Sequence, residues 1–233
     1  MDSLYSATRE AFALLISGDP DLWEIVGISF QVSGTAILIS APVALLIAFS
    51  LAYFNFPGRR ALISLFNTLL SFPAVVVGLI IYILLSNQGP LGNFRLLFTQ
   101  SAMIIAQCVL CLPILIAMGH AAFQSADQRA WETARTLGKS PLGAFSLIVL
   151  EIRFGLLAAL FSGFGRIIAE VGASMMVGGN ILHHTRNIPT AIALETSKGN
   201  FAQGIALGIV LVVMAFVLNL LLQHFQGRGK LAL

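Results

Sequence analysis

The feature that most constrains this chain is a set of apolar stretches, each long enough to cross a lipid bilayer. Three of them contain no Asp, Glu, Lys or Arg: Val26–Phe54, Ala61–Ser86 and Leu97–Phe123. A fourth, Phe201–Leu222, lies near the C-terminus. A helix needs about 20 predominantly apolar residues to cross roughly 30 Å of hydrocarbon. Each stretch is therefore predicted to be a membrane span.

A fifth span is predicted over Leu156–Val177, which is equally apolar apart from Arg166 and Glu170. Lipid offers no partners for backbone amides, so stretches of this length must be helical. Only 10% of the 233 residues are charged, against roughly 25% in an ordinary soluble domain. The sequence predicts an all-α, polytopic bundle of about five transmembrane helices, forming a single domain over residues 1–233.

The loops between the spans predict how the chain is oriented. The N-terminal segment is mainly acidic and lacks the basic start and cleavage site of a signal peptide, so the first span is expected to stay in the mature protein. Lys and Arg are enriched in the first loop, the third loop and the tail (Arg59, Arg60, Arg129, Arg135, Lys139, Arg153, Arg228 and Lys230). The positive-inside rule then places the N-terminus outside and the C-terminus in the cytoplasm. Residues Ser6–Ile16 have an amphipathic pattern and are predicted to form a short interfacial helix.

Several functional classes are disfavoured by what the sequence lacks. Cys108 and Cys111 have C-x-x-C spacing, but no second pair or His accompanies them, so they are interpreted as buried apolar residues and no metal site is predicted. No H-E-x-x-H, G-x-S-x-G or pair of catalytic carboxylates is present, which argues against an intramembrane enzyme. The net charge is only +3, without a basic stripe, so no nucleic-acid partner is expected. A secondary transporter would predict an inverted repeat, and none is visible.

The third loop, residues 124–150, has the composition of an ordered segment. Ser125 and Gln128 have capping-box spacing, which predicts a helix from Ala126. Gly138 is placed to end it. One face of this helix is predicted to carry the apolar residues Ala130, Trp131, Ala134 and Leu137. Such a short helix must dock on something, either the chain's own spans or a partner groove that Trp131 enters.

The wider pattern of this loop resembles the EAA loop of ABC importer permeases, E-A-A-x3-G-x9-I-x-L-P. The matching residues are Glu132, Ala134, Gly138, Ile148 and Leu150. The departures are Thr133 for the first Ala and Glu151 for the Pro. The resemblance implies a coupling helix, with Trp131, Glu132, Ala134 and Gly138 transmitting motion from a cytoplasmic ATPase.

The span with two charges provides a second candidate site. Arg166 and Glu170 are four residues apart and can pair on one helical face. A charge at the centre of a span costs about 2.5–3.5 kcal/mol, so such residues usually face a bundle interior or an aqueous path. Two interpretations stay open: an ion pair that braces the bundle, or a pair in the substrate pathway together with Ser174. Gly178 and Gly179 are predicted to end this helix.

The same region resembles the molybdate, tungstate and sulfate branch of these permeases, and most closely its tungstate-type members. The resemblance rests on residues 164–180, 190–199, 71–78 and 89–92. It implies an importer subunit for an oxyanion, with tungstate first and molybdate, sulfate or another small solute as alternatives. Further implications are a homodimeric pore, two ATPase subunits and an external oxyanion-binding protein. The chain has no G-x-x-x-x-G-K-[ST] motif, so ATP and Mg²⁺ are expected on the ATPase and no cofactor on this chain.

Overall fold

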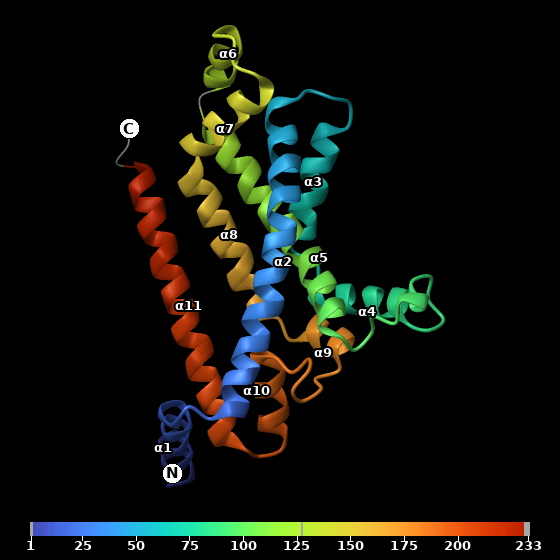
Figure 1. Ribbon diagram of the computed structural model, residues 1–233, viewed down its shortest axis with the longest axis vertical. Helices are drawn as coiled ribbons and strands as arrows, with labels where there is room; N and C mark the ends of the chain where they lie inside the picture. Colours follow the sequence, from blue (N-terminus) through green and yellow to red (C-terminus); the bar gives the residue numbers. More distant parts are fainter. Residues whose placement is uncertain (1, 127, 231–233) are drawn as a thin grey trace. The chain divides into compact units, whose positions relative to one another are not determined.

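The computed structural model describes residues 2–126 and 128–230, and the secondary structure of these residues is helical. The elements follow one another along the chain as drawn in Figure 1. Their bounds are α1 Asp2–Ser17, α2 Pro20–Tyr53, α3 Arg59–Leu69, α4 Ala74–Leu85, η1 Gly92–Phe94 (a 3-10 helix), α5 Gln100–Ser125, α6 Gln128–Thr136, α7 Pro141–Glu151, α8 Arg153–Ile168, α9 Gly172–Gly178, α10 Ile188–Ser197 and α11 Phe201–Lys230.

Three helices are each long and apolar enough to cross a membrane alone: α2, α5 and α11. They occupy the first, third and last of the predicted spans. Pro42 and Pro113 lie inside α2 and α5 without ending them. The span count of the described residues rises from three to five if α3 with α4, and α7 with α8, each form one bent span. The total of five therefore stays a prediction.

The second predicted span, Ala61–Ser86, was expected to be one helix and is broken at Pro73. Helix α3 ends at Leu69, and α4 begins at Ala74. Proline has no N–H for the helical ladder and disfavours helical geometry in the residue before it. The amides of Ser71 and Phe72 bond to carbonyls three residues back, in a tight turn. The expectation of an unbroken helix was wrong for this physical reason.

The predicted span Leu156–Val177 is also broken. Helix α8 ends at Ile168 and the short helix α9 starts at Gly172. Residues 169–171 separate them, so Glu170 lies between two helices instead of on one helical face with Arg166. The predicted stop at Gly178 and Gly179 is confirmed, because α9 ends at Gly178 and Gly179 has a left-handed φ of 70°.

The chain packs into two compact units. One contains residues up to 36, 73–110 and 164–217, and the other contains residues 37–72, 111–163 and those from 218 on. Helices α2, α5, α8 and α11 contribute residues to both units. The units are consequently not separable segments of sequence. The single domain predicted over residues 1–233 stays a prediction.

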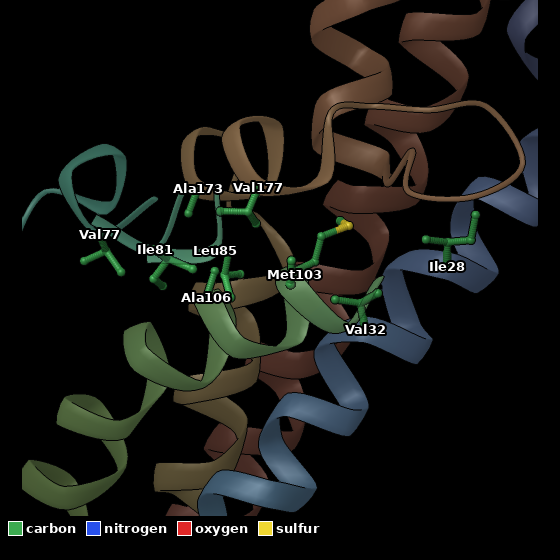
Figure 2. Close-up of a cluster of buried hydrophobic side chains, with 10 residues drawn as sticks. Ile28, Val32, Val77, Ile81, Leu85, Met103, Ala106, Ala173 and Val177 are labelled. Atoms are coloured by element: carbon green, nitrogen blue, oxygen red, sulfur yellow. The ribbon is translucent and has the colours of Figure 1, made fainter. Parts of the chain in front are cut away.

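The first unit has a core built from α2, α4, α5 and α9 (Figure 2). Ile81 of α4, Met103 of α5 and Val177 of α9 are among its buried members. Gly78 allows α4 and α9 to approach closely, because a Cβ there would lie 2.7 Å from the Cα of Ala173. A second cluster joins α1 through Ala11 to α2, α10 and α11. The predicted helix at Ser6–Ile16 is present within α1; its interfacial location stays a prediction.

The second unit has an aromatic core centred on Phe49 of α2. The Phe49 ring lies 5.4 Å from the ring of Phe123 and 4.9 Å from that of Phe145, measured between centroids. These rings come from α2, α5 and α7. Edge-to-face pairs of this kind add to the stabilisation from burial. The cluster fixes α7, and with it the loop that carries α6.

Candidate functional site

The loop helix α6 starts at Gln128, two residues later than predicted. Ser125 is the last residue of α5, and its hydroxyl donates to the carbonyl of Ala122 at 2.7 Å. This bond uses the hydroxyl's one donor and leaves its acceptor sites open, so the predicted capping box of Ser125 and Gln128 stays a prediction. Asp127 and the side chain of Gln128 lie outside the described part of the chain.

Trp131 holds α6 against the aromatic core of its own unit. Its ring centroid lies 5.2 Å from that of Phe49 and 5.7 Å from that of Tyr53. On the same face Ala134 is buried, as predicted. Leu137, placed on this face from the sequence, is instead 79% exposed. Docking on the chain's own helices is thus realised, whereas a contribution of Trp131 to a partner groove stays a prediction.

Gly138 ends α6 in the predicted way. Its φ is +83°, a left-handed conformation that is costly for residues with a Cβ. The amide of Lys139 donates to the carbonyl of Ala134 at 3.0 Å, and that of Gly138 to Arg135 at 3.2 Å. A Cβ on Gly138 would meet nothing within 4 Å. Glycine is therefore required by backbone conformation and not by space.

Helix α7 returns the chain toward the spans. Ser140 caps it by accepting the amide of Gly143 at 3.1 Å, and Pro141 stands in its first turn. The axes of α7 and α8 meet at 73°. The break is at Ile152, with Glu151 just before it where the permease consensus has proline. The turn is thus made without a proline.

The outward side of this loop is exposed. Glu132 is solvent-accessible, and Leu137 and Leu142 are 79% and 80% exposed. Exposed apolar side chains that gather into a patch mark protein-binding surfaces, and the resemblance of this loop to the EAA loop predicts such a surface here. We name these three residues, together with Gly138, the coupling tip. Its partner-facing role stays a prediction.

Glu170 joins α8 to α9. One carboxylate oxygen accepts from the Arg166 guanidinium at 2.8 Å, and the other from the amides of Gly172 at 2.9 Å and Ala173 at 3.3 Å. The carboxylate therefore neutralises Arg166 and caps the N-terminus of α9, where negative charge is favoured. These three donors, one guanidinium N–H and two backbone amides, all belong to the chain itself. This geometry favours the bracing interpretation of the pair over the pathway interpretation.

Ser174 has a different environment from the ion pair. It is 1% exposed, and no described residue hydrogen-bonds its hydroxyl. Gln107 of α5, which the sequence interpretation did not select, is also 1% exposed and donates to the carbonyl of Ile167 at 3.3 Å. Its side-chain oxygen likewise finds no partner among the described residues. Buried polar groups of this kind usually bind something, so both remain pathway candidates.

The connection after α9 is held by buried polar side chains. Thr185 donates to the carbonyl of Gly178 at 2.6 Å and accepts the amide of Ile181 at 2.9 Å. Asn187 and Thr190 form a reciprocal capping box at the start of α10. The signal for it was the run Asn-Ile-Pro-Thr, a cap residue followed by a proline in the first turn, which was not recognised from the sequence.

Glu195, at the other end of α10, completes this network. Burial raises the pKa of its carboxyl, but hydrogen bonds from Lys198 and Asn200 and the charges of Lys198 and Arg186 lower it more, so the pKa lies below its usual value. The Lys198 ammonium is 2.9 Å from the carboxylate, and the Arg186 guanidinium is 4.0 Å away. Arg186 is thus directed to an internal carboxylate.

His183 links the same connection to α2. Its Nδ1 lies 2.6 Å from a carboxylate oxygen of Glu24, and both side chains are exposed. The hydrogen bond to Glu24 is the main cause of a raised pKa for His183. Asp21 is close enough for the three side chains to share an ion, and all three are exposed. Exposed groups in this arrangement are common without a metal, and none was predicted.

Comparison with known proteins places this loop and these spans in a family. Residues 40–229 match the family described as "Binding-protein-dependent transport system inner membrane component". The tungstate uptake system permease protein TupB of Campylobacter jejuni is 39% identical over 219 residues, covering 94% of this chain and 92% of the relative. TupB of Peptoclostridium acidaminophilum is 37% identical, covering 97% and 99%.

A solved structure shares the fold. The crystal structure of an amino acid ABC transporter with histidines aligns with a TM-score of 0.65 and 18% identity, covering 93% of this chain and 98% of that one. At this identity the likeness concerns the fold alone. The family match over residues 40–229 and the similarity to the two TupB permeases show that the chain belongs to the binding-protein-dependent transport system inner membrane components, the membrane-embedded permease subunits of ABC transporters.

Proposed function

We propose that this chain is the membrane-spanning subunit of an ATP-driven importer of tungstate. The observation that carries the proposal is similarity to two tungstate uptake permeases along nearly the whole of each chain. The spans, the coupling tip and the connection after α9 all fall inside the aligned length. Molybdate, sulfate or another small solute is the alternative substrate for the same architecture.

The loop supports a transporter driven from outside the membrane domain. Trp131 fixes α6 to the aromatic core around Phe49, and Gly138 turns the chain directly into α7. Force applied to the coupling tip would therefore reach α2, α5 and α7 through packed rings instead of being absorbed by a flexible tether. Packed cores transmit displacement because they have little free volume.

Two copies of the chain form the pore in this proposal, with two ATPase subunits on the cytoplasmic side and an oxyanion-binding protein outside. ATP and Mg²⁺ are held by the ATPase, and this subunit catalyses no reaction. ATP binding closes the ATPases and moves the α6 helices, so that the pore opens outward; hydrolysis resets it. The C-terminus and the coupling tip are cytoplasmic, and the N-terminus is external.

Uptake in proteoliposomes tests this function. The chain is reconstituted with its ATPase and binding protein, and labelled tungstate is supplied outside with ATP inside. We expect ATP-dependent accumulation that unlabelled tungstate suppresses at lower concentration than molybdate or sulfate. Stronger suppression by molybdate or sulfate would transfer the assignment to that anion, and no ATP-dependent uptake of any oxyanion would overturn it.

A further inference from the structure

The second unit contains a cavity of about 370 Å³ that the proposed transport function does not use. It is lined by parts of α2, α5, α7 and α8, all within residues 37–72 and 111–163. The lining residues are apolar except for Arg153, the first residue of α8. A single cation at an otherwise apolar cavity is an amphipathic site.

Small residues on facing helices explain why the space is open. Ala41 and Ala44 of α2, Gly119 of α5 and Ala159 of α8 all line the cavity. Pro42, also in the lining, adds no side-chain volume beyond its ring. Larger residues at these positions would fill the volume, as they do in a close-packed interior. The lining at α8 extends from Arg153 to Leu160, about 10 Å along the helix axis.

Arg153 retains donors for a ligand. One of its N–H groups donates to the carbonyl of Leu150 at 2.7 Å, and its guanidinium carbon lies 4.5 Å above the Phe154 ring. No carboxylate pairs with it among the described residues. A guanidinium has five N–H donors in a planar fork that suits phosphate. The residue is exposed, so the protein does not enclose its guanidinium.

We propose that this cavity binds an anionic phospholipid, with an acyl chain among the small apolar residues and the phosphate on Arg153. The apolar lining suits the acyl chain of such a lipid, and the guanidinium suits its phosphate. In the topology proposed above, the bend between α7 and α8 faces the cytoplasmic leaflet, which is rich in anionic lipid, and basic pockets between helices on that side bind such headgroups.

A transported oxyanion fits this cavity poorly. A small dianion would have to lose its hydration in a site that offers one cation and no other polar side chain, and that loss is costly without several donors. A lipid leaves its charge at the rim and buries only hydrocarbon. The lipid is therefore assigned as the occupant, and an oxyanion becomes an outcome of the test.

Native mass spectrometry of the purified permease tests the proposal without any transport assay. The permease in detergent is mixed with equal amounts of phosphatidylglycerol and phosphatidylcholine. The lipids that stay bound after release from detergent in the spectrometer are then counted. Arg153→Gln should lower phosphatidylglycerol retention about tenfold, as expected for loss of a charge-assisted hydrogen bond. Ala41→Phe, which fills the cavity, should lower retention of both lipids.

Matched controls keep the result interpretable. Arg60→Gln removes an exposed cation outside the cavity, and Leu38→Phe enlarges a 76% exposed residue on the same helix as Ala41. Both should retain lipid like the unaltered protein. Arg153→Gln adds no volume to the cavity and alters only an exposed side chain at its edge, so it decides the question if Ala41→Phe fails to fold.

Three results would overturn the proposal. They are equal retention of the two lipids with no effect of Arg153→Gln, displacement of bound lipid by tungstate or molybdate, and a change of oligomeric state in Ala41→Phe without loss of lipid. The second result would make the cavity an oxyanion site. The third would make it an interface between two copies of the chain.

Discussion

Two long connections of this molecule are stabilised in opposite ways. The connection through α6 and α7 is held by ring packing, with Trp131 on the core around Phe49, while its polar residues face solvent. The connection after α9 buries its polar residues, among them Thr185, Asn187 and Thr190, and bonds them to one another and to the backbone. The first connection has an exposed outer face and a packed aromatic inner face. In the second, the buried polar side chains are hydrogen-bonded within the connection itself. Only the first of these two connections has the exposed face and the packed support that the proposed coupling to an ATPase requires.

The largest effect is expected on uptake, from changes at the coupling tip. Glu132→Lys reverses an exposed charge, and Gly138→Trp places a bulky side chain at a left-handed position in open space. Both should uncouple ATP hydrolysis from uptake, reducing transport per ATP at least about tenfold, or roughly 1.4 kcal/mol of coupling. Uptake and ATPase rate are measured together in proteoliposomes, with membrane insertion checked by fractionation. Unchanged transport in both variants would remove the coupling assignment.

Among these variants, loss of the Phe49 ring from the aromatic core should have the largest effect on stability. Phe49 is 7% exposed and contacts five other rings, so Phe49→Ala should destabilise the folded protein by about 3–5 kcal/mol. Thermal unfolding in detergent would show this as a lowered Tm. Phe216→Ala is the control, because Phe216 is 63% exposed and the same truncation there should change Tm little. Equal shifts in the two variants would contradict the central role of Phe49.

Loss of one buried hydroxyl in the other connection should cost less. Thr190 accepts the Asn187 amide at 3.1 Å and donates to the Asn187 side chain at 2.8 Å. Thr190→Val leaves the buried Asn187 amide unpaired, while the Asn187 side-chain oxygen keeps its bond from the Thr190 amide; one unpaired buried group costs about 1–3 kcal/mol. Thr133→Val, the same change at an exposed site of α6, should stay within about 0.5 kcal/mol. Comparable Tm losses would show that the two connections are stabilised alike.

The sequence predicted features that depend on local chemistry. Long apolar stretches indicated helices α2, α5 and α11, and Gly138 and Gly179 indicated helix ends, because these signals lie within a few residues of the structure they specify. The ion pair of Arg166 and Glu170 also followed from spacing. The coupling loop was recognised from a pattern of residues without knowledge of what it contacts.

Features that depend on distant partners were missed. The break after Ile168 is a local exception: Glu170 caps α9 through amides two and three residues further on, and spacing alone could not choose between that cap and a continuing helix. Leu137 belongs to the apolar face by periodicity, but it follows the last residue of α6, Thr136, and is 79% exposed instead of packing on the aromatic core. The side chain of Gln107 donates to the carbonyl of Ile167, sixty residues away in the sequence, so its burial could not be predicted from neighbouring residues. Tertiary contacts decide the cases of Leu137 and Gln107.

The two helix-ending glycines offer a finer comparison. Both have a left-handed φ, +83° for Gly138 and +70° for Gly179, so alanine costs each about 1 kcal/mol of backbone strain. At Gly179 the new Cβ would also lie 2.8 Å from the Phe98 ring, whereas at Gly138 it would meet nothing. Gly179→Ala should therefore lower Tm further than Gly138→Ala. The opposite order, measured in the same detergent, would mean that the connection after α9 yields more easily than its contacts indicate.

The smallest expected effect is a pH dependence confined to the connection after α9. The Glu24 carboxylate, 2.6 Å from His183, raises the histidine pKa above its usual value of about 6.5, with Asp21 adding to the rise and Arg186 opposing it. A raised folded-state pKa stabilises the folded form fully below the unfolded value, and this contribution is lost as pH rises through the folded pKa. The connection should accordingly exchange its amide hydrogens faster, after correction for intrinsic rates, as pH increases above about 6.5.

His183→Gln should remove that step while leaving exchange in α6 and α7 unchanged, because those helices have no part in the pair. A step that persists in His183→Gln would assign the titration to another group. The contrast between the connection after α9 and the connection through α6 and α7 would then rest on the buried hydrogen bonds alone.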